Sequence, residues 1–162
     1  MKLAKSLNRL GTETAFSVLA EAKKIEATGK PMIHLGLGQP DFKTPKHIVD
    51  AAKKALDDGH HGYVLSNGIL ECRQSVTRKI KKLYKQDIDP ERIIIMPGGK
   101  PTMSYAIQCF GEPGVEIIHP TPAFPIYESM INFTGSTPVP YDLTKDKDLK
   151  FNPEEVLSLI TD

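Results

Sequence analysis

Apolar residues recur at helical spacing in three stretches of the first half of the chain. The spacing predicts helices over residues 14–28, 45–58 and 70–83, because positions three and four apart share one face of a helix. Gly29 and Gly59 follow the first two stretches, and glycine commonly ends a helix. Thr44–Pro45 opens the second stretch as an N-cap followed by a proline at the first helical position.

The third of these helices is expected to be amphipathic. We expect its inward face to carry Leu70, Val76, Ile80 and Leu83. We expect its solvated face to carry the basic residues Arg73, Arg78, Lys79, Lys81 and Lys82.

Short apolar runs alternate with helical patterns in the rest of the chain. The run Arg92–Met96 is β-branched and unbroken, which is typical of a strand buried on both faces of a parallel sheet. The other predicted elements are a short strand or extended segment at 31–36, a helix from about Thr102, a strand at 115–119, a helix from about Pro125, a strand at 137–140 and a helix opened by Asn152–Pro153. This alternation favours an α/β fold with a mostly parallel sheet flanked by helices.

Composition and charge narrow the possible partners. The 162 residues are 40% hydrophobic and 25% charged, which suits a globular protein with one sizeable core. The net charge of +1 gives no field that would favour nucleic acid or a membrane surface. No stretch reaches the roughly 18–20 apolar residues of a membrane span, so we expect a cytoplasmic protein. Cys72 and Cys109 lie far apart without a CxxC motif, so we expect them to pack as small apolar residues rather than bind zinc.

The stretch MPGGKPT, residues 96–102, follows a predicted strand and precedes a predicted helix. In that arrangement free backbone N–H groups and the positive end of the helix dipole can bind an anion, and glycine lets the anion approach closely. The stretch matches neither the GxxxxGK[ST] nor the GxGxxG motif, which disfavours nucleotide binding. Taken alone, Gly98–Gly99 is more often only a tight turn, and both interpretations stay open on the residues themselves.

Three other positions are candidates for binding, and two of them, Gly38 and Tyr63, also have a structural interpretation. Gly38, in the loop GLGQPDF, can turn the chain or leave its N–H open to a substrate carboxylate. Tyr63 can pack in a core or donate its phenol to a phosphate oxygen. Phe124 stands between prolines after a strand, where α/β sheets bind ligands, and its ring can stack on a flat cofactor. His60 and His61 are expected to be exposed and non-catalytic, because adjacent histidines rarely point at one metal ion.

Four separated blocks agree in type and order with a known family: HLGLGQPDFKTPKHIVDAAKKAL, GYVLSNGILECR, IIIMPGGKPTMSYAI and HPTPAFPIYESMINFTGSTPVPY. Together they resemble the class I and II aminotransferases of fold type I, which have the pyridoxal-phosphate fold of aspartate aminotransferase. The resemblance runs from about Leu3 to Asp162. It implies that residues 1–44 form an N-terminal arm and small-domain segment, and that residues 45–162 form the N-terminal part of the large cofactor-binding domain.

The resemblance also implies roles for single residues. Gly38 matches the glycine whose N–H meets the substrate carboxylate, and Gly99 and Lys100 match the turn whose backbone amides hold the phosphate of pyridoxal 5'-phosphate. Phe124 matches the aromatic residue that stacks on the pyridine ring. Tyr63 matches the tyrosine that reaches the phosphate of the neighbouring subunit, which implies a homodimer with shared sites.

The same resemblance places the Schiff-base lysine, the acid paired with the pyridine nitrogen and the carboxylate-binding arginine after residue 162. We therefore expect the chain to be a truncated, inactive N-terminal part of an enzyme of amino-acid metabolism, which moves an amino group between an amino acid and a 2-oxo acid. Lys100 is expected to act through its backbone rather than as the Schiff-base lysine. The alternatives are a lyase or synthase of the same fold, or a non-catalytic chain.

Overall fold

The computed structural model describes residues 2–11, 14–146 and 148–161, without the side chains of residues 14–16. Residues 1, 12 and 13 of the expected N-terminal arm therefore lie outside the described residues. The chain forms two units, Met1–Leu37 with Gly98–Asp162, and Gly38–Pro97, and each is described by itself. The domain boundary expected at residue 44 stays a prediction.

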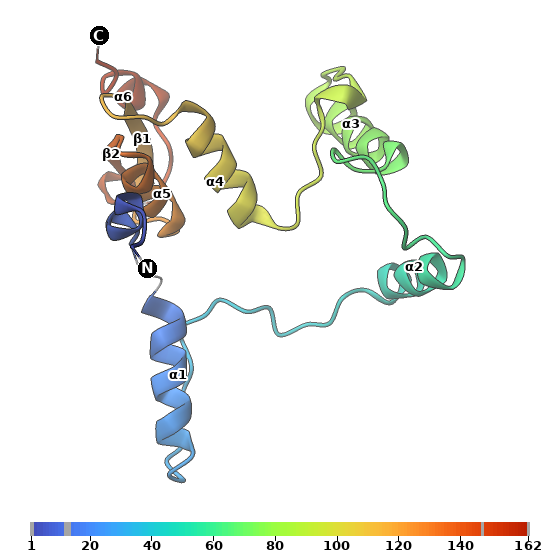
Figure 1. Cartoon of the computed structure of the whole chain (residues 1–162), viewed down its shortest axis with the longest axis horizontal. Helices are drawn as coiled ribbons and strands as arrows, with labels where there is room; N and C mark the ends of the chain where they lie inside the picture. The colour runs from blue at the N-terminus through green and yellow to red at the C-terminus, as the bar shows by residue number, and fades with distance from the viewer. Residues whose placement is uncertain (1, 12–13, 147, 162) are drawn as a thin grey trace. The chain divides into compact units, whose positions relative to one another are not determined.

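The first unit holds a β–α–β arrangement (Figure 1). Strand β1 (Glu116–Thr121) and strand β2 (Thr137–Asp142) are parallel, with Glu116 opposite Thr137, and helix α5 (Ile126–Thr134) connects them. A parallel pair requires such a crossover, because a hairpin would reverse the second strand. The expected α/β fold with parallel strands and flanking helices is confirmed.

The remaining elements of this unit lie before and after that arrangement. They are η1 (Lys5–Arg9), α1 (Thr14–Glu26), α4 (Gly99–Phe110), η3 (Leu143–Lys145) and α6 (Pro153–Leu157). Asn152 caps α6 by accepting a hydrogen bond from the Glu154 N–H at 3.1 Å, so the predicted start of the last helix is confirmed.

The core of the first unit lies where α5 covers the strands. Ile131 of α5 is fully buried, and Met130 and Tyr141 are buried beside it. The Tyr141 hydroxyl accepts a hydrogen bond from the Asn152 N–H at 3.0 Å, and its ring meets Phe151 edge-on. At the end of β2, hydrogen bonds from the Thr144 hydroxyl and N–H lower the pKa of the Asp142 carboxyl. These contacts fix the position of the segment after β2.

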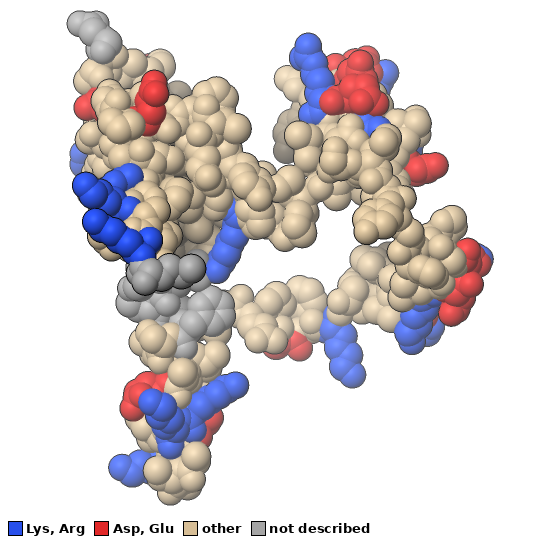
Figure 2. Space-filling model, viewed as in Figure 1, with Lys and Arg blue, Asp and Glu red and all other residues tan. Residues whose placement is uncertain are grey.

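The second unit contains α2 (Lys46–Asp57), α3 (Leu70–Tyr84) and η2 (Pro90–Arg92). The helix bounds confirm both predicted helices. Ion pairs four residues apart, Lys46–Asp50 and Lys54–Asp58, lie on α2. Figure 2 shows acidic and basic side chains mixed on this face of α2, which is typical of a solvated helix surface. Within the described residues, no helix combines the length and the apolar character needed to cross a membrane.

Two predicted extended segments are not strands in the structure. Residues 31–36 and 93–96 are irregular, and the only described strands are β1 and β2. A β-branched run becomes a strand by hydrogen bonding to a neighbour, and no described strand pairs with either segment. The Ile95 N–H instead donates to the Asn67 carbonyl in a loop, and the Ile94 side chain is exposed. The prediction of a strand buried on both faces was therefore wrong for this chain.

Candidate functional site

The glycine turn at residues 98–99 forms the start of helix α4. The helix begins at Gly99, three residues earlier than predicted, because Pro101 is compatible with a first turn, where its missing N–H costs nothing. Gly98 precedes it with φ 105° and ψ 169°, a conformation that is essentially restricted to glycine. The Thr102 hydroxyl donates to the Gly98 carbonyl at 3.1 Å and braces the turn, a contact that the sequence does not predict.

This turn has the properties of an anion-binding site. No side chain caps α4, and the first-turn amides of a helix, including that of Gly99, have no acceptor within the helix. A Cβ built at Gly98 would meet no described atom within 4 Å, and one at Gly99 would meet only the Met103 Cε at 3.9 Å. The described residues therefore leave room for a phosphate against the backbone, where the helix dipole favours negative charge. The phosphate-binding role of the turn stays a prediction.

Lys100 and Phe124 are brought together in the first unit. Phe124 lies three residues after the end of β1, and the residue is 42% exposed. The Lys100 Nζ lies 5.4 Å from the centre of that ring, within the range of a cation–π interaction. The Phe124 ring thus lies within reach of the side chain of Lys100, the second residue of α4.

Gly38 and Tyr63 belong to the second unit. A Cβ at Gly38 would meet no described atom within 4 Å. The Tyr63 side chain is fully exposed, which excludes the alternative of a core tyrosine within this unit. His60 and His61 are exposed, as predicted. The roles of Gly38 and Tyr63 stay predictions.

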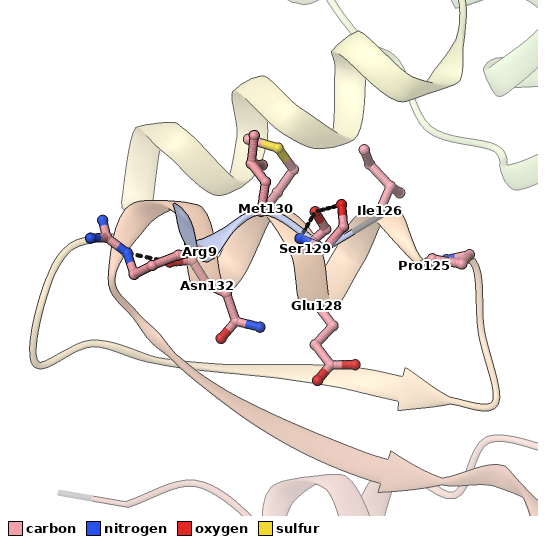
Figure 3. A pocket seen from close by; sticks show the side chains of 9 residues that line it. Arg9, Pro125, Ile126, Glu128, Ser129, Met130 and Asn132 are labelled. Carbon is pink, nitrogen blue, oxygen red and sulfur yellow. Dashed lines mark hydrogen bonds between the residues drawn. The ribbon is translucent and has the colours of Figure 1, made fainter. Parts of the chain in front are cut away.

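The N-terminal segment is held along α5 in the first unit, as Figure 3 shows. Arg9 donates to the carbonyls of Asn132 and Phe133 at 2.8 and 2.7 Å, which satisfies carbonyls at the C-terminal end of α5. The Gly11 N–H donates to the Ser129 Oγ at 3.0 Å. The cavity of about 490 Å³ between these elements contains none of the predicted site residues. We therefore interpret it as part of an anchor for the N-terminal segment.

Arg73 corrects the expectation that the basic residues of α3 all face solvent. Its side chain is only 2% exposed, and it donates to the Gly68 carbonyl at 3.1 Å, the Pro90 carbonyl at 3.0 Å and the Glu91 carboxylate at 2.8 Å. Helical periodicity places a residue on a face but does not reveal which loop carbonyls fold back over that face. The general rule that charged residues are exposed therefore predicts the wrong environment for Arg73.

Cys72 and Cys109 are also corrected, because both side chains are exposed and not packed as small apolar residues. Cys72 lies on the exposed side of α3, and Cys109 lies in the last turn of α4. In the part of the chain that the structure describes, no group of three or more His, Cys, Asp or Glu side chains could hold a metal ion.

Comparison with known proteins gives a consistent result. The profile of the family described as "Aminotransferase class I and II" matches residues 30–162. Aspartate aminotransferase of Bacillus subtilis is 34% identical over 162 residues, which is 100% of this chain and 41% of that protein. The (5-formylfuran-3-yl)methyl phosphate transaminase of Methanocaldococcus jannaschii is 39% identical over 142 residues, 88% of this chain and 38% of that protein.

Solved structures agree with these relatives. Aspartate aminotransferase from Thermus thermophilus with maleate has a TM-score of 0.89 at 28% identity, and it covers 99% of this chain and 42% of its own. Alanine aminotransferase from Pyrococcus furiosus has a TM-score of 0.89 at 26% identity, over 99% of this chain and 41% of its own. The chain spans about two fifths of the length of the curated relatives that it matches.

Proposed function

The chain belongs to the class I and II aminotransferase family, and from this premise we propose that it forms the phosphate-binding and ring-binding part of a pyridoxal-phosphate aminotransferase. Members of this family depend on pyridoxal phosphate. The observation that carries the proposal is the Gly98–Gly99 turn at the start of α4, next to the Lys100–Phe124 pair. A dianionic phosphate and a flat ring are the two groups that such a pair of features can bind together.

The cofactor supplies the electron sink that stabilises a carbanion at the substrate α-carbon. The proposed work of this chain is to bind and orient. The Gly99 and Lys100 amides bind the phosphate, the Phe124 ring stacks on the pyridine, and the Gly38 N–H binds one carboxylate of the substrate. Tyr63 is proposed to donate its hydroxyl to the phosphate in the partner subunit of a homodimer, which its full exposure supports.

The proposed substrates are an amino acid and a 2-oxo acid, in a cytoplasmic homodimer that acts in amino-acid metabolism. The lysine that bonds to the cofactor, the acid at the pyridine nitrogen and the carboxylate-binding arginine are proposed to lie outside residues 1–162. Amino-group transfer is favoured over a lyase or synthase reaction, because the relatives above are named as aminotransferases or transaminases.

The complete protein tests this function directly. Loaded with pyridoxal phosphate and given an amino acid alone, it should release one equivalent of 2-oxo acid per site and then stop. A second 2-oxo acid should restart it and yield the matching amino acid, as a ping-pong exchange requires. Release of ammonia with continuous turnover, and without a second amino acid, would instead establish a lyase.

Lys100 provides a second test. We expect borohydride reduction of the complete, cofactor-loaded protein to fix the cofactor on a lysine outside residues 1–162 and not on Lys100. A side chain that starts at the phosphate turn lies beside the phosphate, whereas the bonding lysine must reach the aldehyde carbon across the ring. Peptide mass mapping gives the position, and the Lys100→Gln variant serves as the control, because it should be labelled to the same extent. Cofactor found on Lys100 would refute the backbone role.

A further inference from the structure

Arg73 is the most buried charged side chain among the described residues, and the proposed function does not use it. A buried arginine is costly unless its donors are satisfied. Here Nε donates to the Gly68 carbonyl, and Nη1 donates to both the Pro90 carbonyl and the Glu91 carboxylate. One guanidinium therefore joins the loop before α3 to the segment that begins at η2.

A second link closes the same loop at its other end. The Ile95 N–H donates to the Asn67 carbonyl at 3.1 Å. Gly68 has φ 95°, and a Cβ there would lie 2.7 Å from the Ile95 Cγ1, so the Ile95 side chain lies closer to the Gly68 backbone than a residue with a side chain would allow. Residues 67–68 are thus held by Arg73 on one side and by Ile95 on the other.

The two segments that Arg73 joins lead directly to two proposed phosphate ligands. Tyr63 stands four residues before Asn67, and the turn at Gly98 begins three residues after Ile95. The Tyr63 hydroxyl and the amides of the turn must each lie within a few tenths of an ångström of the productive position to bind a phosphate with full strength. We propose that Arg73 is a positioning residue for cofactor-phosphate binding, a role that rests on the function proposed above.

The planar fork of arginine is required for this role. Lysine keeps the positive charge, but its single ammonium cannot reach two carbonyls and a carboxylate from fixed, coplanar directions. The exposed Glu91 carboxylate contributes less than the two carbonyls, because water screens it. We therefore expect Arg73→Lys to weaken the binding of pyridoxal phosphate more than Glu91→Gln does. Arg78→Lys provides the matched control, since Arg78 lies on the same helix, is exposed and donates to Ser75.

The test compares pyridoxal phosphate with pyridoxal, which lacks the phosphate, in absorbance titrations of the complete apoprotein. We expect Arg73→Lys to raise the Kd for pyridoxal phosphate about tenfold and to leave the Kd for pyridoxal within about twofold. Glu91→Gln should raise the Kd for pyridoxal phosphate by about twofold and leave the Kd for pyridoxal unchanged. Arg78→Lys should change neither of these two Kd values. If Arg73 had only a structural role, its substitution would weaken the binding of pyridoxal phosphate and of pyridoxal equally.

The outcomes separate the inference from the function on which it rests. The positioning role would be overturned if Arg73→Lys weakened the binding of pyridoxal phosphate and of pyridoxal equally, or if it changed neither affinity. If Arg73→Lys does not fold, as shown by circular dichroism, Glu91→Gln decides, and the same equal weakening or absence of change would overturn the role. If the unchanged protein itself shows no preference for pyridoxal phosphate over pyridoxal, the proposed function fails instead.

Discussion

Replacing Gly99 with proline is expected to weaken the binding of pyridoxal phosphate by about 10- to 100-fold while α4 remains folded. Proline removes one backbone N–H, and a hydrogen bond to a charged group contributes about 1.5–3 kcal/mol. Proline is favoured at the first helical position, which Gly99 occupies. The ψ of 169° at Gly98 is extended, and a residue before proline prefers extended backbone. The substitution therefore removes the donor without opposing the local fold.

The matched variant is Gly99→Ala, which keeps the N–H. Its Cβ would meet only the Met103 Cε at 3.9 Å, so it should weaken binding by no more than about threefold. Absorbance titration of the complete apoprotein measures both affinities, and circular dichroism checks the helix. Pyridoxal should bind both variants alike, because it has no phosphate. If Gly99→Pro binds pyridoxal phosphate as well as Gly99→Ala does, the amide of Gly99 is not a phosphate ligand.

The elements that carry the site could be predicted where local pattern and packing agree. β1, α5 and β2 follow from apolar runs and helical spacing, and the same three elements bury Met130, Ile131 and Tyr141. The position of Phe124 after β1 is predictable, because Pro122 follows the end of the strand and Pro125 precedes the first residue of α5. In this part of the chain, residues close together in the sequence determine the local structure.

The unpredicted features depend on residues far apart or on backbone conformation. The run Ile93–Ile95 has strand composition, but strand formation needs a partner that composition does not specify. The burial of Arg73 depends on carbonyls at Gly68 and Pro90, five and 17 residues away. The unusual φ of Gly98 could be suspected from a glycine pair, but the brace from Thr102 depends on α4 starting at Gly99.

Mixed dimers are expected to recover activity that neither parent variant has. The proposal places the Gly99 amide and the Tyr63 hydroxyl at one phosphate, with each from a different subunit. At limiting cofactor, Tyr63→Phe and Gly99→Pro homodimers should both be inactive, because each loses one phosphate ligand at both sites. In a dimer of one Tyr63→Phe subunit and one Gly99→Pro subunit, two-fold symmetry puts both defects in the same site. The other site is then intact, so the mixed dimer should show about half the activity of the unchanged dimer.

Two different affinity tags allow the mixed dimer to be purified after co-expression, and bound cofactor and transfer activity are measured at one limiting cofactor concentration. An unchanged dimer with the same two tags gives the reference. The intact site should bind the cofactor with the unchanged Kd, so half of the sites should fill. If Tyr63 served its own subunit, each site of the mixed dimer would carry one defect, and the mixed dimer would be as inactive as its parents. Recovery therefore requires the cross-subunit role, since no arrangement within one subunit leaves an intact site.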